Sequence, residues 1–160
     1  MSKPRIAILG IFVADLAFRA KRLPVMGETL LGQGFAMGPG GKGSNQSVAA
    51  ARAGGDVSFI AKLGRDSFGD IALKTWAADG IDTSEVMISD TVPTGAAFIF
   101  VSSETGDNAI IVEAGAAGTL AADDVNLAEK AISGARFLSR SLKRRWPPAG
   151  AGWNWRGNMA

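Results

Sequence analysis

The chain has 160 residues, of which 47% are hydrophobic and 20% charged, and its formal net charge is +2. This length and composition are typical of one globular domain with its own apolar core. Because the sequence contains no cysteine and no histidine, disulfide scaffolds, zinc-finger sites, cysteine nucleophiles and histidine-based triads are excluded. No apolar run approaches the roughly 20 residues of a membrane helix, and the N-terminus is too weakly apolar for a secretory signal. We therefore expect a cytoplasmic protein without a membrane partner.

The basic charge is concentrated at the C-terminal end. Residues 130–160 hold seven basic and no acidic residues, whereas residues 1–129 hold all 15 acidic residues and ten basic ones. The last part of the chain also contains three of the four tryptophans and follows neither helical nor strand periodicity. Basic and aromatic residues can bind single-stranded nucleic acid or a membrane surface. The basic cluster here is short and lies on a segment without a fold signal, so we expect no nucleic-acid partner.

Strand-like and helix-like segments alternate over residues 5–139. Apolar runs that end in glycine predict strands, and apolar residues at helical spacing predict helices. Strands that alternate with helices indicate an α/β fold with a largely parallel sheet. In chain order, the predicted elements are a strand at 5–10, a helix at 44–55, a strand at 56–64, a helix at 66–80, two strands at 95–103 and 108–115, a helix at 121–135 and the start of a strand at 135–139.

Local signals mark the ends of several predicted elements. The first helix has Ser44 or Asn45 near its start, and the second can be capped by Asp66 or Ser67. The polar residues 104–107 (ETGD) connect the two consecutive strands and indicate a hairpin. A hairpin does not fit the alternating pattern, so we expect it to lie outside the main sheet as a flap.

A glycine-rich loop, GPGGKGSN at residues 38–45, precedes the first predicted helix. It satisfies G-x-G-x-x-G, but a dinucleotide-binding loop directly follows the first strand, and here 27 residues lie between them. A Walker A loop does not fit either, because Gly43 rather than Ser or Thr follows Lys42, and Met37 stands where a glycine is needed. Considered alone, the loop can be explained equally well as a binding loop or as a glycine-rich turn that leads into a helix.

The surrounding residues resemble the PfkB family of carbohydrate kinases. GGKGSNQSVAAARAGGDVSFIAKLGRDSFG, from Gly40 to Gly69, is similar to the N-terminal signature of that family, and further pieces agree in order: VADL, GET, DGID, TGAAFIFV and GDNAIIVEAGAAGTL. Together they are more similar to the ribokinase branch than to other branches, over about residues 4–139. The resemblance implies an α/β, ribokinase-like three-layer fold with a mostly parallel sheet and a small β lid, here truncated to its N-terminal half.

The resemblance also implies that the glycine-rich loop binds a sugar rather than a nucleotide. In the family, the residues that match Asp15 and Asn45 hydrogen-bond sugar hydroxyls, and those that match Gly40, Gly41 and Lys42 line the site. A carboxylate acceptor and an amide that both donates and accepts suit vicinal hydroxyls, and glycines let the main chain approach a small polyol. From the residues alone, Asp15 is equally a turn residue, Asn45 a helix cap and Lys42 a solvated side chain.

A β lid over the sugar is a further implication of the resemblance. Residues 29–38 and the hairpin around residues 104–107 would build it, with Ala97 or Phe98 near the pocket. A closed lid excludes water, which competes with the sugar hydroxyl for the transferred phosphoryl group. The lid often mediates dimer contacts in the family, so a homodimer is expected. The family usually has asparagine where this chain has Val13, which leaves open which pentose is bound.

Phosphoryl transfer to an alcohol also requires a base, a phosphate cradle and a metal ion. In PfkB kinases, the C-terminal motifs N-x-x-E and D-T-x-G-A-G-D bind ATP and Mg²⁺, and the last aspartate is the base. Neither motif occurs here, and AGAG at residues 149–152 is followed by Trp153 instead of aspartate. The resemblance therefore implies ATP-dependent phosphorylation of a hydroxyl of ribose or a related pentose, and we expect this chain to carry only the sugar-binding half, without a catalytic base, a metal site or kinase activity of its own. The alternative is a catalytically inactive sugar-binding fragment or pseudo-kinase.

Residues 140–160 can be interpreted as an out-of-frame translation. When the reading frame is moved back by one base, permissive codons let residues 140–148 read QLETPLAA and residues 152–160 read LELARQHG. The first resembles a family strand that ends in Gln-Leu-Glu, and the second is typical of a helix. We therefore predict a folded part at 1–139 and an aberrant basic, tryptophan-rich tail beyond it, which the DNA sequence can test.

Overall fold

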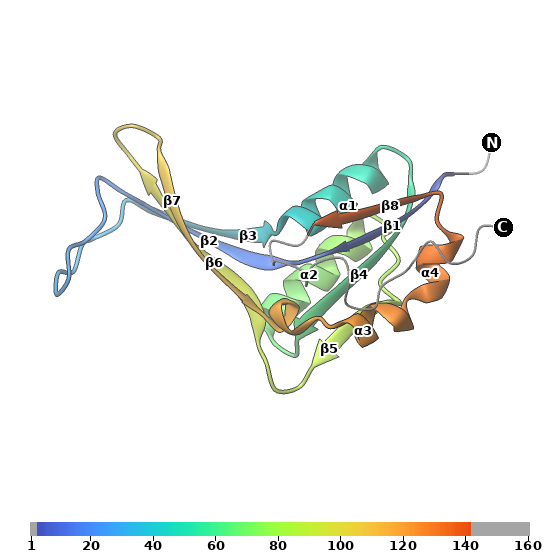
Figure 1. Cartoon of the computed structure of the whole chain (residues 1–160). Helices are drawn as coiled ribbons and strands as arrows, with labels where there is room; N and C mark the ends of the chain where they lie inside the picture. The colour runs from blue at the N-terminus through green and yellow to red at the C-terminus, as the bar shows by residue number, and fades with distance from the viewer. Residues whose placement is uncertain (1–2, 142–160) are drawn as a thin grey trace, which may run out of the picture.

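Residues 3–141, which the computed structural model describes, form two four-stranded sheets (Figure 1). The core sheet has the strand order β5-β4-β1-β8 and is parallel throughout. The lid sheet has the order β3-β2-β6-β7. The strands are β1 (Arg5–Gly10), β2 (Val13–Ala20), β3 (Gly34–Gly40), β4 (Asp56–Gly64), β5 (Val86–Ser89), β6 (Thr94–Ser102), β7 (Asn108–Gly115) and β8 (Phe137–Ser141), and the helices are α1 (Lys42–Arg52), α2 (Ser67–Ala78), the 3₁₀ helix η1 (Ala116–Thr119), α3 (Ala122–Leu127) and α4 (Glu129–Gly134).

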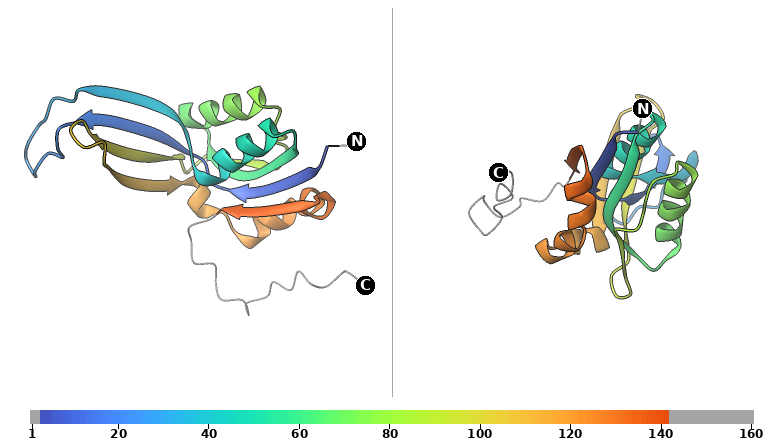
Figure 2. Two further views of the ribbon diagram at one scale, coloured as in Figure 1. Left: turned by 90° about the horizontal axis from the view of Figure 1, so that it is seen from above. Right: turned by 90° about the vertical axis from the view of Figure 1, so that its right-hand side faces the viewer.

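The core sheet lies between two layers of helices, with α1 and α2 on one face and α3 and α4 on the other (Figure 2). Neighbouring residues of β1 alternate between these layers. Ile8 packs on the side of α1 and α2, whereas Leu9 packs beside Val125 of α3. A parallel strand that is covered on both faces is apolar at successive positions, which explains the unbroken apolar run at its centre. The predicted α/β architecture with a parallel sheet is confirmed.

The larger core cluster is centred on Trp76 of α2, which is fully buried. Its ring meets Phe12 and Phe59 edge to face, with ring centroids 5.7 and 4.8 Å apart. Such contacts add roughly 0.5–1.5 kcal/mol to the burial of the rings. Because Phe12 lies in the connection between β1 and β2, the cluster ties the base of the lid sheet to α2.

Helix α1 begins two residues earlier than predicted. It starts at Lys42, with Ser44 and Asn45 near its start as expected, and Gly41 is its N-cap residue without a side-chain capping bond. Gly41 has a φ of +90°, a conformation that residues with a Cβ rarely adopt. The glycine therefore lets β3 turn directly into the helix. Capping by Asn45, the interpretation from the residues alone, is not observed.

Helix α2 starts as the sequence predicts. Of the two candidate caps, Asp66 occupies the N-cap position, and its side chain accepts a hydrogen bond from the Gly69 N–H at 2.9 Å. The helix ends at Ala78, and Gly80 follows with a φ of +65°. A polar cap and a terminating glycine thus mark a helix whose apolar positions fill the core.

The single helix predicted for residues 121–135 is divided into α3 and α4. The break lies at Ala128, whose N–H bonds to the carbonyl of Val125 three residues earlier, at 3.1 Å. Both residues are buried against the core sheet. The hydrogen bond between them closes a tight turn at the end of α3, and α4 begins directly after it. Within residues 3–141, no helix is long and apolar enough to cross a membrane.

The lid sheet projects from one end of the core sheet (Figure 1). At its centre β2 and β6 are parallel, and β3 and β7 are its antiparallel edges. The predicted hairpin is confirmed as β6 and β7. Residues 34–38 belong to β3 as expected, but residues 29–33 lie in the connection that precedes it. Strand β2 continues to Ala20, beyond the four-residue VADL piece that the resemblance marked.

Strand β8 pairs with β1 at the edge of the core sheet. It runs from Phe137 to Ser141, so it extends two residues beyond the predicted boundary at residue 139. The rest of the predicted tail lies outside the described residues, and its out-of-frame origin stays a prediction.

Candidate functional site

Asp15 lies in β2, close to the point where the lid sheet leaves the core. It pairs with Gly38 of β3 on one side and with Ala97 of β6 on the other. Its carboxylate lies directly over Gly40, where a Cβ would overlap the carboxylate oxygens. The absence of a side chain at Gly40 thus leaves the space that the acidic side chain occupies.

The carboxylate of Asp15 is half-buried without a hydrogen-bond partner. Among residues 3–141, no side chain or backbone group donates a hydrogen bond to it. Burial alone raises the pKa of the Asp15 carboxyl above its ordinary value. An acceptor that has lost part of its hydration and has no partner is suited to receive hydrogen bonds from a hydroxylated ligand.

Gly40 and Gly41 connect β3 to α1 at the base of the lid. Gly40 is buried, and a Cβ at Gly41 would overlap the carbonyl oxygen of Ile11. The backbone of this connection therefore lies against the β1–β2 connection, with no space for a side chain. The first N–H groups of a helix have no partner inside it, so α1 begins with donors beside the Asp15 strand.

Lys42 is the first residue of α1, Asn45 is the fourth, and both are exposed. The Asn45 N–H donates to the carbonyl of Gly41 at 2.9 Å, so its backbone is already part of the helix. The structure thus brings Asp15, Gly40 and Gly41 into contact or close approach, and it places the other two predicted residues at the adjoining helix start.

Two buried hydroxyl groups hold this first turn in place. The indole N–H of Trp76 donates to Ser44 Oγ at 2.9 Å, and Ser47 Oγ donates to the carbonyl of Gly43 at 3.0 Å. Helical spacing marks Trp76 only as an apolar position of α2, and Ser44 was expected only near the start of α1. The bond between them joins two helices, and helical periodicity carries no signal for such a contact.

The register of the lid distinguishes the two residues expected near the pocket. Ala97 pairs with Asp15 and therefore lies on the same face of the lid sheet. Phe98 pairs with Leu16 on the opposite face, where its ring lies 5.7 Å from that of Phe18. Val13 precedes Asp15 by two positions and lies on its face, buried. Ala97 and Val13 are thus apolar residues on the same face of the lid sheet as the carboxylate.

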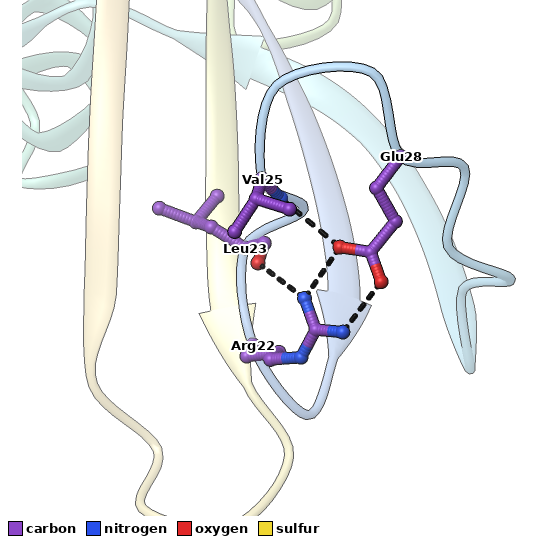
Figure 3. Close-up of polar contacts among 4 residues, drawn as sticks. All are labelled: Arg22, Leu23, Val25 and Glu28. Carbon is purple, nitrogen blue, oxygen red and sulfur yellow. Dashed lines mark hydrogen bonds and ion pairs between the residues drawn. The ribbon is translucent and has the colours of Figure 1, made fainter.

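An ion pair orders the connection between β2 and β3 (Figure 3). The Glu28 carboxylate accepts hydrogen bonds from both terminal nitrogens of Arg22, at 2.5 and 2.6 Å, and from the Val25 N–H at 3.0 Å. Arg22 also donates to the carbonyl of Leu23 at 3.1 Å. These bonds, above all those from Arg22, lower the pKa of Glu28 to about 2. Glu28, the acidic residue of the GET piece, thus connects both ends of the turn at the lid tip through hydrogen bonds.

Two hollows in the described part of the chain lie away from Asp15. One of about 100 Å³ is bounded by Arg5 and Lys130, and one of about 520 Å³ lies at the lid tip beside Arg22 and Glu104. Neither contains the unpartnered carboxylate, so the chemistry rather than the concavity locates the candidate site. Over residues 3–141, no group of three acidic side chains could hold a metal ion.

Comparisons with known proteins identify what the chain is similar to. Residues 3–142 match the pfkB family of carbohydrate kinases. Mouse ribokinase is 37% identical over 138 residues, which cover 86% of this chain and 42% of the mouse protein. The structure of ribokinase from Giardia lamblia matches with a TM-score of 0.77 at 32% identity, over 87% of this chain and 42% of that one. That of Arabidopsis thaliana ribokinase complexed with ribose and ATP matches with a TM-score of 0.74 at 26% identity, over 87% and 45%.

The chain spans less than half of the length of each of these relatives. The predicted ribokinase-like fold is confirmed over the matched part, with its parallel sheet and lid. Matches of this extent and identity also confirm the family that the sequence motifs indicated.

Proposed function

Because the chain belongs to the PfkB family of carbohydrate kinases, we propose that residues 3–141 form the sugar-binding half of an ATP-dependent kinase for ribose or a related pentose. One observation carries the proposal. Asp15 is a half-buried carboxylate without a hydrogen-bond partner among residues 3–141, and it lies over Gly40 at the base of the lid. The burial of an acceptor costs free energy unless a donor reaches it. A sugar hydroxyl supplies that donor.

Each residue of the site has a distinct role in this proposal. The Asp15 carboxylate accepts hydrogen bonds from two neighbouring hydroxyls, and the Asn45 amide both donates and accepts. Gly40 and Gly41 bring the main chain close to the ring, where a Cβ at either position would overlap other atoms. Lys42 is exposed beside them and contributes a charge that a polar ligand can reach. Together these groups orient the sugar.

Val13 limits how well the proposed site can distinguish one pentose from another. It lies on the Asp15 face of β2, where its apolar, buried side chain offers no hydrogen bond to a hydroxyl. A site that does not bond to a hydroxyl discriminates only weakly against a sugar that lacks it. We therefore propose that ribose and 2-deoxyribose bind with similar affinities.

The proposal includes no ligand of ATP or Mg²⁺ among residues 3–141. When bound, they supply the phosphoryl group and the positive charge that stabilises its transfer. The described residues bind and orient the sugar and, beneath the lid sheet, keep water from its hydroxyl. We propose that the 160-residue chain binds a pentose without turning it over.

We also propose that the lid sheet mediates a homodimer. On the face opposite Asp15, Phe18 and Phe35 pack 4.9 Å apart and remain 41% and 59% exposed, and Met37 beside them is 51% exposed. Contiguous exposed apolar side chains of this kind mark interaction surfaces. A second copy of the chain would cover them.

Isothermal titration calorimetry of the 160-residue chain with D-ribose, 2-deoxy-D-ribose and D-glucose tests the proposed function. We expect saturable binding of both pentoses and weaker binding of the hexose. A coupled ADP-release assay with ATP and Mg²⁺ should show no turnover. Absence of pentose binding at millimolar concentration would refute the sugar site, and sustained ADP release with ribose would refute the inactivity of the chain.

A further inference from the structure

The lid sheet joins the core at two places. At the first, β1 continues through Phe12 into β2, and β3 leads back into α1. At the second, the chain enters β6 at Thr94 and leaves β7 at Gly115. A backbone hydrogen bond joins the two chain segments of this second junction, because the Ala116 N–H donates to the carbonyl of Pro93 at 2.7 Å.

Asp66 ties the second junction to the core. Its Oδ1 accepts from the Gly69 N–H at 2.9 Å at the start of α2, and its Oδ2 accepts from the Thr94 N–H at 2.7 Å. Burial opposes the ionisation of this carboxyl, but the hydrogen bonds outweigh it and hold the pKa of Asp66 below its ordinary value. A single ionised side chain thus joins a core helix to the first residue of a lid strand.

The hydroxyl of Thr94 makes a second connection. It accepts from the Gly64 N–H at 2.8 Å and donates to the Gly64 carbonyl at 3.3 Å. Thr94 is only 5% exposed, so loss of its hydroxyl leaves buried backbone groups without that partner. The end of β4 and the start of β6 are held together at this point.

Glycines pack tightly around the junction. A Cβ at Gly64 would overlap the backbone of Thr94, and one at Gly69 would lie 3.2 Å from its hydroxyl. Gly95 and Gly115 follow immediately on the lid side, and Gly115 has a φ of +55°. Both are paired in the lid sheet, Gly95 with Val13 and Gly115 with Thr94, and a Cβ at Gly115 would overlap the backbone of Gly95. The absence of side chains at these glycines therefore lets the start of β6 and the end of β7 pack closely around the pair of Asp66 and Thr94.

We propose that Asp66 and Thr94 form the fixed pivot of the lid sheet and act as positioning residues for the sugar. Thr94 precedes Ala97 by three positions, and Ala97 pairs with Asp15. At about 3.3 Å per residue, the pivot lies roughly 10 Å along β6 from the candidate sugar site. The pivot fixes the position of β6 relative to the Asp15 carboxylate. The positioning role rests on the proposed function, whereas the pivot itself does not.

Amide hydrogen exchange of the 160-residue chain tests the pivot without any sugar. Asp66→Asn keeps one oxygen to cap α2, but it replaces the oxygen that accepts from the Thr94 N–H by an NH₂ donor, and Thr94→Val removes the hydroxyl. In both variants, we expect exchange at the start of β6 and the end of β7 to accelerate about tenfold. The centre of β4 and α2 should keep their protection.

Thr75→Val is the matched control for this experiment. It removes a partly buried hydroxyl that bonds within α2, to the carbonyl of Ile71 at 2.8 Å, and it should leave β6 unchanged. Unaltered exchange at β6 in Asp66→Asn and Thr94→Val would overturn the pivot. A uniform acceleration over the whole core sheet would also overturn it, since that result means global destabilisation.

Calorimetry with D-ribose tests the positioning role. We expect Thr94→Val to weaken sugar binding about tenfold, and Thr94→Ser, which keeps the hydroxyl, to restore it. Thr75→Val should bind like the wild type. If Thr94→Val exchanges faster at β6 but binds ribose as tightly as the wild type, the positioning role is wrong. If the wild-type chain binds no pentose, that role fails with the proposed function, and the exchange experiment still decides the pivot.

Discussion

Trp76 of α2 donates its indole N–H to Ser44 of α1 across 2.9 Å, inside a core where both side chains are buried. The bond lies one residue before Asn45 and two after Lys42, so it holds the helix start that carries two of the predicted sugar ligands. An apolar side chain at Trp76 would fill the same space without this bond. The indole therefore adds a directional restraint to a hydrophobic contact.

Replacement of Ser44 by alanine should destabilise the fold. The variant leaves the indole N–H buried without a partner, which costs about 1–3 kcal/mol. Urea unfolding, followed by far-ultraviolet circular dichroism, measures the change. Ser47→Ala is the control, since it removes an equally buried hydroxyl whose loss leaves no other side chain unpaired. Equal free energies of unfolding for the two variants would contradict the assigned role of the bond.

Gly40→Ala should weaken sugar binding more than it weakens the fold. A Cβ at this position would overlap the Asp15 carboxylate, which must then move. Since a hydrogen bond to a charged group contributes roughly 1.5–3 kcal/mol, we expect the affinity for D-ribose to fall about tenfold or more. Gly38→Ala has no atom within 4 Å of the added Cβ, and it should bind like the wild type. Calorimetry that ranks the two variants equally would contradict this prediction.

The ion pair at the lid tip predicts a distinct pH dependence. The pKa of Glu28 is lowered from 4.5 to about 2, first by the bonds from Arg22. A carboxyl group whose pKa is lowered by folding stabilises the folded loop at pH values above its pKa in the unfolded chain. This contribution is lost as the pH falls from about 4.5 toward about 2. The Glu28 carboxyl resonance should therefore stay unchanged between about pH 5 and 3.5. In Arg22→Ala it should titrate at higher pH, and a wild-type midpoint near 4.5 would disprove the pairing.

The apolar face of the lid predicts a change in oligomeric state. Wild-type chain should sediment as a dimer, and Phe35→Glu should sediment as a monomer because a charge replaces an aromatic ring at the proposed interface. Leu127→Glu, at a residue 77% exposed on α3, is the control and should remain dimeric. Analytical ultracentrifugation distinguishes these outcomes. A monomeric wild type at micromolar concentration would refute the homodimer.

The core sheet could be predicted from the sequence because its strands are covered on both faces. The run at Arg5–Gly10 and the run at Asp56–Gly64 are largely apolar and bounded by glycine, and both proved to be parallel neighbours. Strand β5 (Val86–Ser89) was missed, since four residues are too few for a periodic signal. The break at Ala128 was also missed, because burial against the sheet rather than a helix-breaking residue accompanies it.

The candidate site depends on contacts that no local pattern records. Motif resemblance predicted Asp15 and the two glycines, and the structure places them together at the base of the lid. The start of α1 was misplaced because it depends on the positive φ of Gly41, which the chain adopts against the β1–β2 connection. Asp66 was predicted only as a cap. Its second oxygen bonds to Thr94, 28 residues away, and only the folded chain brings the two together.

Asp15→Asn should stabilise the free chain while it weakens sugar binding. Burial raises the pKa of this carboxyl, so the ionised form is less favourable in the folded chain than in the unfolded chain. The folded state therefore loses stability as the pH rises from the ordinary value through the raised one, and wild type carries this cost at pH 7. Asparagine removes it. Because the group is still partly exposed and solvent screens it, the gain should stay below about 1 kcal/mol.

The same substitution removes the charge that strengthens hydrogen bonds from sugar hydroxyls. We therefore expect the affinity for D-ribose to fall about tenfold, as calorimetry would show, while the urea midpoint rises slightly. Asp70→Asn, at an exposed carboxylate in the first turn of α2, should lose a little helix-dipole stabilisation and bind the sugar normally. Opposite changes in stability and affinity at Asp15 alone would identify it as a binding residue held at a cost to the fold. A loss of both would instead mean that Asp15 supports the structure of the lid base.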